Sequence, residues 1–197
     1  MKKIATVQVV LCGIAPLLMH NSQLADPMNT WTRDMKKISS KRNKTDDDML
    51  MLREYEWNGG MYFDELIGPY IPAEVIEAAI AAGAAKSKKK KAVTVSVGIE
   101  ADRISLEYEG PRSRSALYEK PDFVDVRPVK VNKGSTVMRT RPKFMHPWRL
   151  RFNLMIRVDI MNVADVLRAL EVAGSDCAIG DYRPKYGRFM VEKFEEV

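Results

Sequence analysis

A short stretch near the C-terminus holds the residues best suited to bind an anion. Residues 177–194 read CAIGDYRPKYGRFMVEKF, with cationic and aromatic side chains between two glycines. Successive backbone N–H groups there could form a concave anion site, and guanidinium and ammonium groups beside them would hold phosphate oxygens. The alternative is a plain helix-to-strand turn, in which glycine supplies positive φ and the cations are solvated. The candidate binding residues of this loop are Gly180, Arg183, Lys185, Tyr186, Gly187 and Arg188.

A second group of cations lies on strands predicted upstream of this loop. Cations neutralise phosphates while aromatic and guanidinium planes stack on bases, and single-strand binding uses both. We expect Arg139, Arg141, Arg149 and Arg151 to contact phosphates, with Trp148 and Tyr186 as stacking candidates. The alternative is the solvated polar face that an antiparallel sheet usually carries.

His20 is the candidate for acid–base chemistry. It follows the first predicted strand, where its imidazole could act as general acid or base in a metal-independent RNA cleavage. A structural hydrogen bond is the alternative role. Asp46, Asp47 and Asp48 could suggest magnesium, but acids in a first helical turn are also explained by the helix dipole.

The composition indicates one basic globular domain spanning residues 1–197. Hydrophobic residues make up 46% of the chain, and the formal charge of +6 raises the expectation of a polyanionic partner. Two cysteines and two histidines form no metal pattern or disulfide framework, so we expect a cytoplasmic protein with no metal and no cofactor. No phosphate-loop, dinucleotide, nucleophile-elbow or HExxH motif occurs in the sequence.

The N-terminal segment MKKIATVQVVLCGIAPLLMH has features of a secretory signal, but Gln8 and Pro16 interrupt its apolar run. We therefore interpret residues 3–13 as a buried strand. No segment reaches the roughly 18 apolar residues of a membrane span, so no membrane partner is expected.

Hydrophobic periodicity and capping signals predict the elements that carry these residues. Strands are expected at 3–13, 92–99, 148–158 and 188–194, with a hairpin around Asn132-Lys133-Gly134. Helices are expected from Thr45, from Pro72 and from Asn162, while residues 22–44 are predicted to be an insertion or long loop. Without insertions at about 22–60 and 102–126, the order predicts an α+β, ferredoxin-like (RRM-like) βαββαβ antiparallel sheet with helices on one face.

Three segments resemble motifs of the CRISPR-associated RAMP superfamily. The resemblance is that of a divergent, stand-alone member. AIGDYRPKYGRFMV resembles its C-terminal glycine-rich loop, GIAPLLMHNSQ its opening turn, and GPYIPAEVIEAAIAAGAAK its first helix start. Asp181 stands where a second glycine is often found, and Ala73-Glu74-Val75 replace the usual small and serine residues. The sequence also looks like a small protein of a phage or mobile element.

The resemblance implies an RRM-like domain that holds single-stranded nucleic acid by its backbone, often as a filament subunit. It implies that the C-terminal glycine-rich loop contacts the backbone of the nucleic acid, and that His20 and Asn21 lie beside this loop. Some relatives are endoribonucleases with a histidine near this place, while most backbone-type relatives bind without cutting.

The leading hypothesis is a non-catalytic protein that binds single-stranded RNA or DNA and assembles as a homo-oligomer or filament along it. The first alternative is a metal-independent endoribonuclease that uses His20. The second is a protein-interaction or inhibitor module whose basic surface meets an acidic partner.

Overall fold

The structure is a computed structural model that describes residues 3–130 and 134–197, and it has two antiparallel sheets. The main sheet has the strand order β10-β1-β9-β6-β4-β3, and β5 also pairs with β9. The smaller sheet has the order β2-β8-β7. The strands of the main sheet are β1 (Ile4–Gly13), β3 (Phe63–Asp64), β4 (Gly68–Pro72), β5 (Val97–Ile99), β6 (Arg103–Glu107), β9 (Arg149–Arg157) and β10 (Phe189–Glu196). Those of the smaller sheet are β2 (Leu17–Leu18), β7 (Val124–Lys130) and β8 (Thr136–Phe144).

The predicted strands at both ends of the chain and at residues 148–158 are confirmed. Leu154 of β9 lies opposite Val7 of β1, and Leu150 lies opposite Leu11; all four side chains are fully buried. Alternation of apolar and polar residues puts one set of side chains into the core, as period-2 patterning requires. The predicted β7–β8 hairpin is also confirmed, although Asn132 and Lys133 of its turn lie outside the described residues.

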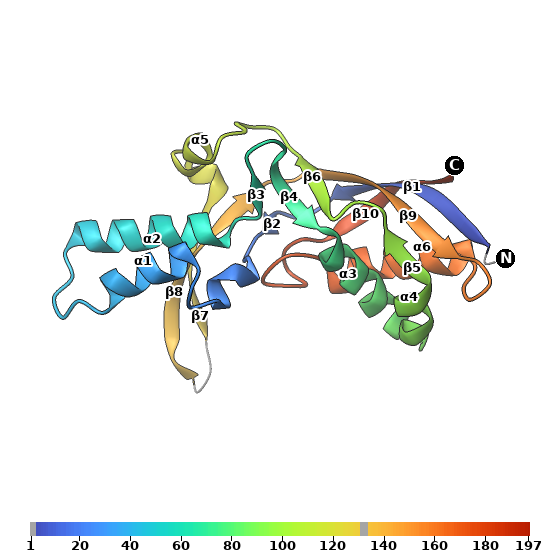
Figure 1. The fold of residues 1–197 in the computed structure, drawn as a ribbon, viewed down its shortest axis with the longest axis horizontal. Helices are drawn as coiled ribbons and strands as arrows, with labels where there is room; N and C mark the ends of the chain where they lie inside the picture. Colours follow the sequence, from blue (N-terminus) through green and yellow to red (C-terminus); the bar gives the residue numbers. More distant parts are fainter. Residues whose placement is uncertain (1–2, 131–133) are drawn as a thin grey trace.

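Three helices cover one side of the main sheet: α3 (Ala73–Ala85), α4 (Lys90–Ser96) and α6 (Val163–Val172) (Figure 1). Asn162 caps α6 by accepting a hydrogen bond from the Asp165 N–H at 2.7 Å, as predicted. Gly83 lets α3 approach α6 closely, because a Cβ there would lie 2.0 Å from the carbonyl oxygen of Ala169. A five-residue π-helix, η4 (Ala173–Cys177), follows α6 and leads into the C-terminal loop.

The strand predicted at residues 92–99 is mostly wrong. Helix α4 occupies most of it, and only Val97–Ile99 form a strand. The β-branched residues favoured a strand, but Val93 packs into the core and the Ser96 hydroxyl donates to the Ala92 carbonyl at 2.7 Å. Tertiary contact has overridden local propensity here.

Residues 22–44, predicted to be an insertion or long loop, are not a long loop, because they contain η1 (Ser22–Ala25) and helix α1 (Thr30–Ser39). The Asn29 side chain accepts a hydrogen bond from the Trp31 N–H, which caps α1. Helix α1 packs along α2 (Asp46–Gly60), which begins at the predicted Thr45 cap. Thr45 and Asp48 exchange side-chain to backbone hydrogen bonds, so Asp48 acts as a capping residue.

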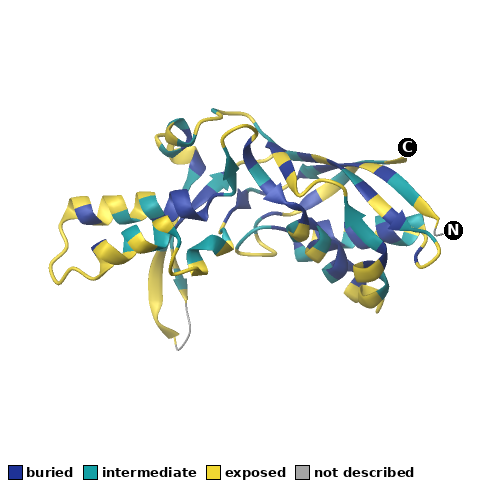
Figure 2. Cartoon of the chain, viewed as in Figure 1, coloured by how far each residue is buried: buried dark blue, intermediate teal, exposed yellow. Residues whose placement is uncertain are grey.

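The insertion predicted at residues 102–126 is more regular than expected. It holds β6, helix α5 (Arg114–Tyr118) and η2 (Pro121–Phe123), and β6 joins the main sheet by pairing with β9 and β4. The Trp57 indole N–H donates to the Phe123 carbonyl at 2.9 Å, which ties η2 to helix α2. Figure 2 shows that the outer ends of the α1–α2 pair and of the β7–β8 hairpin are mostly exposed. None of the described helices is long and apolar enough to cross a membrane.

Candidate nucleic-acid interface

The C-terminal loop, defined here as residues 178–188, is hydrogen-bonded to β2 and to the turn between β1 and β2. The Asp181 N–H donates to the Leu18 carbonyl, and the Gly187 N–H donates to the Pro16 carbonyl, both at 2.8 Å. Gly180 and Gly187 have φ values of +76° and +73°, which glycine adopts without steric cost. The glycines therefore form the turn that the plain interpretation of this loop predicted.

Part of the loop backbone is already hydrogen-bonded within the protein. Besides those of Asp181 and Gly187, the N–H groups of Ile179 and Tyr186 donate to the carbonyls of Gly187 and Tyr182. These donors already have protein acceptors, so the predicted backbone contact at Gly187 is replaced by a structural role. The N–H groups of Gly180, Arg183 and Lys185 have no acceptor among the described residues, and they remain candidates for an anion contact.

The cationic side chains of the loop remain free. Arg183, Lys185 and Arg188, called the loop cations below, are all exposed. Within residues 3–130 and 134–197, none of the three forms an ion pair or a side-chain hydrogen bond, although Lys185 lies 5.9 Å from the centre of the Tyr186 ring. Three uncompensated cations on one loop make the electrostatic potential there positive.

Two tyrosines of the loop form a cluster with Arg127 of β7. The Arg127 guanidinium lies 5.6 Å from the centre of the Tyr182 ring and 4.7 Å from that of Tyr186. Arg127 also donates to the Tyr186 hydroxyl at 2.5 Å. Tyr186 is thereby held against the small sheet, whereas Tyr182, whose ring centre also lies 5.9 Å from the Arg141 guanidinium, is 44% exposed. Sequence reasoning did not select Tyr182, although an aromatic residue two positions after Gly180 could have been included.

Arg141 of β8 is a structural cation. It is only 4% exposed and lies between two carboxylates, with its Nε 2.8 Å from Asp181 and its Nη1 3.9 Å from Asp125. Within the described part of the chain, Nε and Nη1 make no hydrogen bond of good geometry, so the guanidinium is held mainly by charge. The predicted phosphate contact at Arg141 is therefore wrong, because this side chain cannot reach a ligand on the surface.

Arg139 remains partly accessible. Its Nη1 donates to Glu56 of helix α2 at 2.7 Å, and 38% of its side chain is exposed. The other Glu56 oxygen accepts the Thr140 N–H at 2.8 Å. Arg139 is thus positioned by α2 and keeps an exposed edge near the loop.

His20 and Asn21 lie near the loop, and their environments differ. His20 is exposed, and its electrostatic neighbours include Asp181 of the loop and Arg139 of β8. Partial removal of water lowers the pKa of His20 from its ordinary value of 6.5, and Arg139 and Arg141 act in the same direction against Asp181 and Glu56. Asn21 accepts the Gln23 N–H and donates to the Met61 carbonyl, so its side chain serves the fold.

The arginines on the outer face of the main sheet are already paired. Arg149 contacts Glu192 at 2.6 Å, and Arg151 contacts Glu107 at 2.7 Å. Both pairs are exposed and therefore weak, but their charges are compensated before any ligand arrives. This sheet face is closer to the solvated alternative than to a cationic binding platform.

The stacking role predicted for Trp148 is wrong. The ring is fully buried against Gly13, where an added Cβ would lie 2.1 Å from the indole. Its Nε1–H donates to the Ala15 carbonyl at 2.9 Å. Trp148 thus belongs to the core beneath the turn that follows β1 and has no surface to offer a base.

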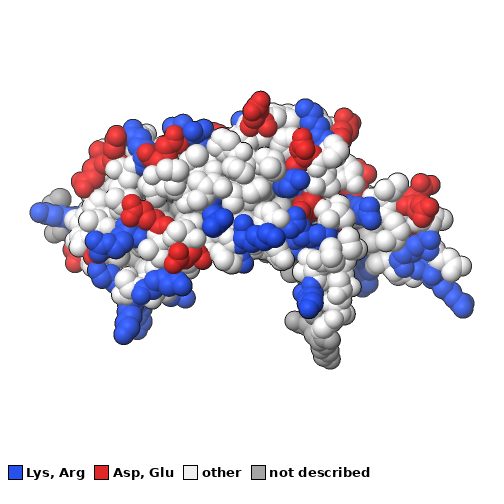
Figure 3. Space-filling view, turned by 180° about the vertical axis from the view of Figure 1, so that it is seen from behind, with Lys and Arg blue, Asp and Glu red and all other residues white. Residues whose placement is uncertain are grey.

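The resulting candidate interface combines the loop cations with Tyr182, Arg139 and His20. Figure 3 shows Lys and Arg side chains gathered across the middle of one face of the molecule. In the described part of the chain, no group of three or more His, Cys, Asp or Glu residues could hold a metal ion.

Comparison with known proteins reveals a likeness in fold. No family model matches the chain, and no curated protein matches it. A solved structure does. It is a chain of the cryo-EM structure of the type III-B Cmr-beta bound to cognate target RNA, with a TM-score of 0.59 and 14% identity. The match covers 99% of this chain and 61% of that chain, so this chain spans about three fifths of its neighbour's length.

Proposed function

We propose that this chain is a divergent RAMP-like protein that binds single-stranded RNA. The fold supports this proposal, because the matching chain comes from a structure bound to cognate target RNA. The strand order β10-β1-β9, with β5 and β6 on the far side of β9 and helices α3 and α6 on one face, supports a ferredoxin-like core.

The observation that carries the proposal is the set of free loop cations beside an exposed aromatic ring. Among the described residues, Arg183, Lys185 and Arg188 have no carboxylate partner, whereas Arg149 and Arg151 do. Phosphates would release counterions on meeting the loop cations, and Tyr182 would stack on a base. The side chains that would supply charge and stacking, both of which single-strand binding requires, thus lie on the same loop.

Fluorescence anisotropy with labelled single-stranded RNA, single-stranded DNA and duplex at two salt concentrations tests the proposal. Replacing Arg183 and Lys185 with Ala should weaken RNA binding and lower the magnitude of the log–log salt slope by about 1.4, at about 0.7 for each phosphate contact on a single strand. The matched control replaces Lys86 and Lys88, which are exposed near the end of α3, and should leave the slope unchanged. An unchanged slope in the loop variant would refute the site.

The proposal extends to assembly along the ligand. Size-exclusion chromatography of the protein with RNA of increasing length should show complexes that grow by one protein mass at a time. A complex that stays at one protein per strand, whatever the strand length, would contradict assembly while leaving RNA binding intact.

A metal-independent endoribonuclease is the second candidate, and the position of His20 favours it. The imidazole lies among Asp181, Arg139 and Glu56, and its lowered pKa keeps it neutral at pH 7, as a general base requires. Under this alternative, purified protein cuts RNA in EDTA and His20→Ala abolishes the cut. Intact RNA after prolonged incubation would dispose of it.

A further inference from the structure

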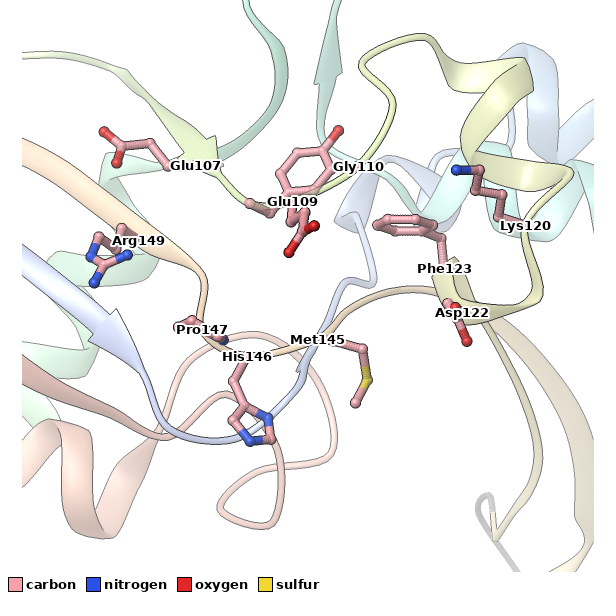
Figure 4. A pocket seen from close by; sticks show the side chains of 11 residues that line it. Glu107, Glu109, Gly110, Lys120, Asp122, Phe123, Met145, His146, Pro147 and Arg149 are labelled. Carbon is pink, nitrogen blue, oxygen red and sulfur yellow. The ribbon is translucent and has the colours of Figure 1, made fainter.

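A cavity of about 710 Å³ lies between the end of β6, η2 and the segment that joins β8 to β9 (Figure 4). This volume falls within the range of pockets that hold small organic ligands. Nothing in the proposed phosphate contacts uses it. The cavity is lined by Glu107, Tyr108, Glu109, Gly110, Lys120, Asp122, Phe123, Met145, His146, Pro147 and Arg149.

The walls of the cavity combine aromatic surface with free carboxylates. Tyr108 and Phe123 pack edge to face with ring centroids 5.8 Å apart. Glu109 and Asp122 are exposed, and within the described residues neither side chain has an ion pair or hydrogen bond, whereas Glu107 is bound to Arg151. Figure 4 shows the Glu109 and Phe123 side chains on the wall of the same cavity. The cavity therefore offers hydrogen-bond acceptors beside aromatic side chains.

The cavity is joined to the C-terminal loop through Gly13, the last residue of β1, and Ile14, the residue after it. The Gly13 N–H donates to the Trp148 carbonyl at 2.7 Å, next to the rim residues His146 and Pro147. The Ile14 N–H donates to the Arg188 carbonyl at 2.9 Å. These two hydrogen bonds place the backbone of Arg188, where the C-terminal loop ends, close to the rim of the cavity.

The chemistry of the free carboxylates selects among nucleobases. An ionised carboxylate only accepts hydrogen bonds, and the exocyclic amino groups of cytosine and adenine donate them. At the place of the cytosine amino group, uracil carries a carbonyl oxygen, which a carboxylate repels. Cytosine and uracil present rings of the same size to the aromatic wall, so a difference in affinity between them reports the hydrogen-bonding edge, where they differ in the exocyclic group and in N3, which accepts in cytosine and donates in uracil.

We propose that this cavity binds a nucleobase with an exocyclic amino group, taken from the RNA strand that the loop cations hold. The inference rests on the proposed RNA binding and adds a base preference to it. Lys120, which has no ion pair in the described chain, lies on the rim and would balance the phosphate of the bound nucleotide.

The test compares oligo(C) with oligo(U) of equal length by anisotropy at pH 7. Wild-type protein should bind oligo(C) about 5-fold more tightly or better, the lower end of what a good base contact contributes. Glu109→Gln, Asp122→Asn and the double variant should reduce this ratio, because an amide donates to uracil as readily as it accepts from cytosine. Glu171→Gln with Glu196→Gln, at exposed sites away from the cavity, keeps the same net charge and should retain the ratio.

The outcomes separate this inference from the function on which it rests. If wild-type protein binds no single-stranded RNA, the proposed function fails, and the base pocket fails with it. If it binds oligo(C) and oligo(U) equally, or if the double variant folds normally by circular dichroism and keeps the full preference, only the pocket is refuted. A double variant that binds RNA normally but no longer self-associates would refute the base pocket and identify the cavity as a protein interface.

Discussion

Asp181 of the C-terminal loop lies 2.8 Å from the Nε of Arg141, which is buried in the small sheet. This contact joins the loop that would hold RNA to the hairpin that leaves the body of the molecule. The Arg141 guanidinium is almost completely buried, so it depends on nearby carboxylates to balance its charge. Its other carboxylate neighbour, Asp125, lies 3.9 Å away and cannot replace the closer contact with Asp181.

Replacing Asp181 with Ala should therefore destabilise the fold. The substitution leaves a buried cation with one distant partner, and we expect the free energy of unfolding to fall by about 1–3 kcal/mol. Urea denaturation followed by tryptophan fluorescence measures it. Asp176→Ala, an exposed acid just before the loop, is the control and should change stability by less than about 0.5 kcal/mol. Equal effects of the two variants would show that the Arg141 contact contributes nothing.

Gly187→Ala should disrupt the C-terminal loop. A Cβ there would lie 1.8 Å from the Ile179 carbonyl oxygen, and the φ of +73° is unfavourable for alanine. The left-handed conformation and the clash together should cost about 2–4 kcal/mol of unfolding free energy. Gly98→Ala serves as the comparison, because no atom lies within 4 Å of its added Cβ. Thermal melts that coincide for the two variants would contradict the loop geometry.

Stability should fall as the pH drops below 6.5, in part because of His20. Its pKa in the folded protein lies below the ordinary value of 6.5, so the unfolded chain binds this proton more readily than the folded chain does. The contribution is fully present above pH 6.5 and is lost as the pH falls through the lowered pKa. His20→Gln should therefore lose less unfolding free energy than wild type between pH 7 and pH 5. Parallel stability curves for the two proteins would refute the shift.

The sheet arginines should contribute little to phosphate binding. Arg149 and Arg151 are already matched by Glu192 and Glu107, so Arg149→Gln with Arg151→Gln removes cations that are not free. We expect a salt slope equal to that of wild type, in contrast to the change of about 1.4 for the loop variant. A larger slope change for the sheet variant than for the loop variant would move the site onto the sheet.

Short sequence patterns were enough to predict several helices and strands. The capping residues Thr45 and Asn162 mark the starts of helices α2 and α6, and the apolar–polar alternation along β9 identifies its buried face. The same alternation groups Trp148 with Leu150 and Phe152, and it could have excluded Trp148 as a stacking residue. Helix α4 was missed because its β-branched residues favour a strand until contact with the core is included.

The ion pairs of the candidate site join residues that are far apart in the sequence, and no sequence pattern predicts them. Arg141 meets Asp181 across 40 residues of sequence, and Arg149 meets Glu192 across a similar distance. The sequence therefore predicted which arginines lie on strands. It could not predict which of them form ion pairs with a carboxylate and which do not. That difference decides which of the predicted residues remain candidates.

Glu56 fixes strand β8 of the β7–β8 hairpin to helix α2. Its two carboxylate oxygens bind Arg139 and the Thr140 N–H, so strand β8 cannot slide along helix α2 without breaking both hydrogen bonds. The angle at which the β7–β8 hairpin leaves the body is thus set by a residue outside the hairpin. A force applied to the hairpin would therefore be transmitted through Glu56 to helix α2.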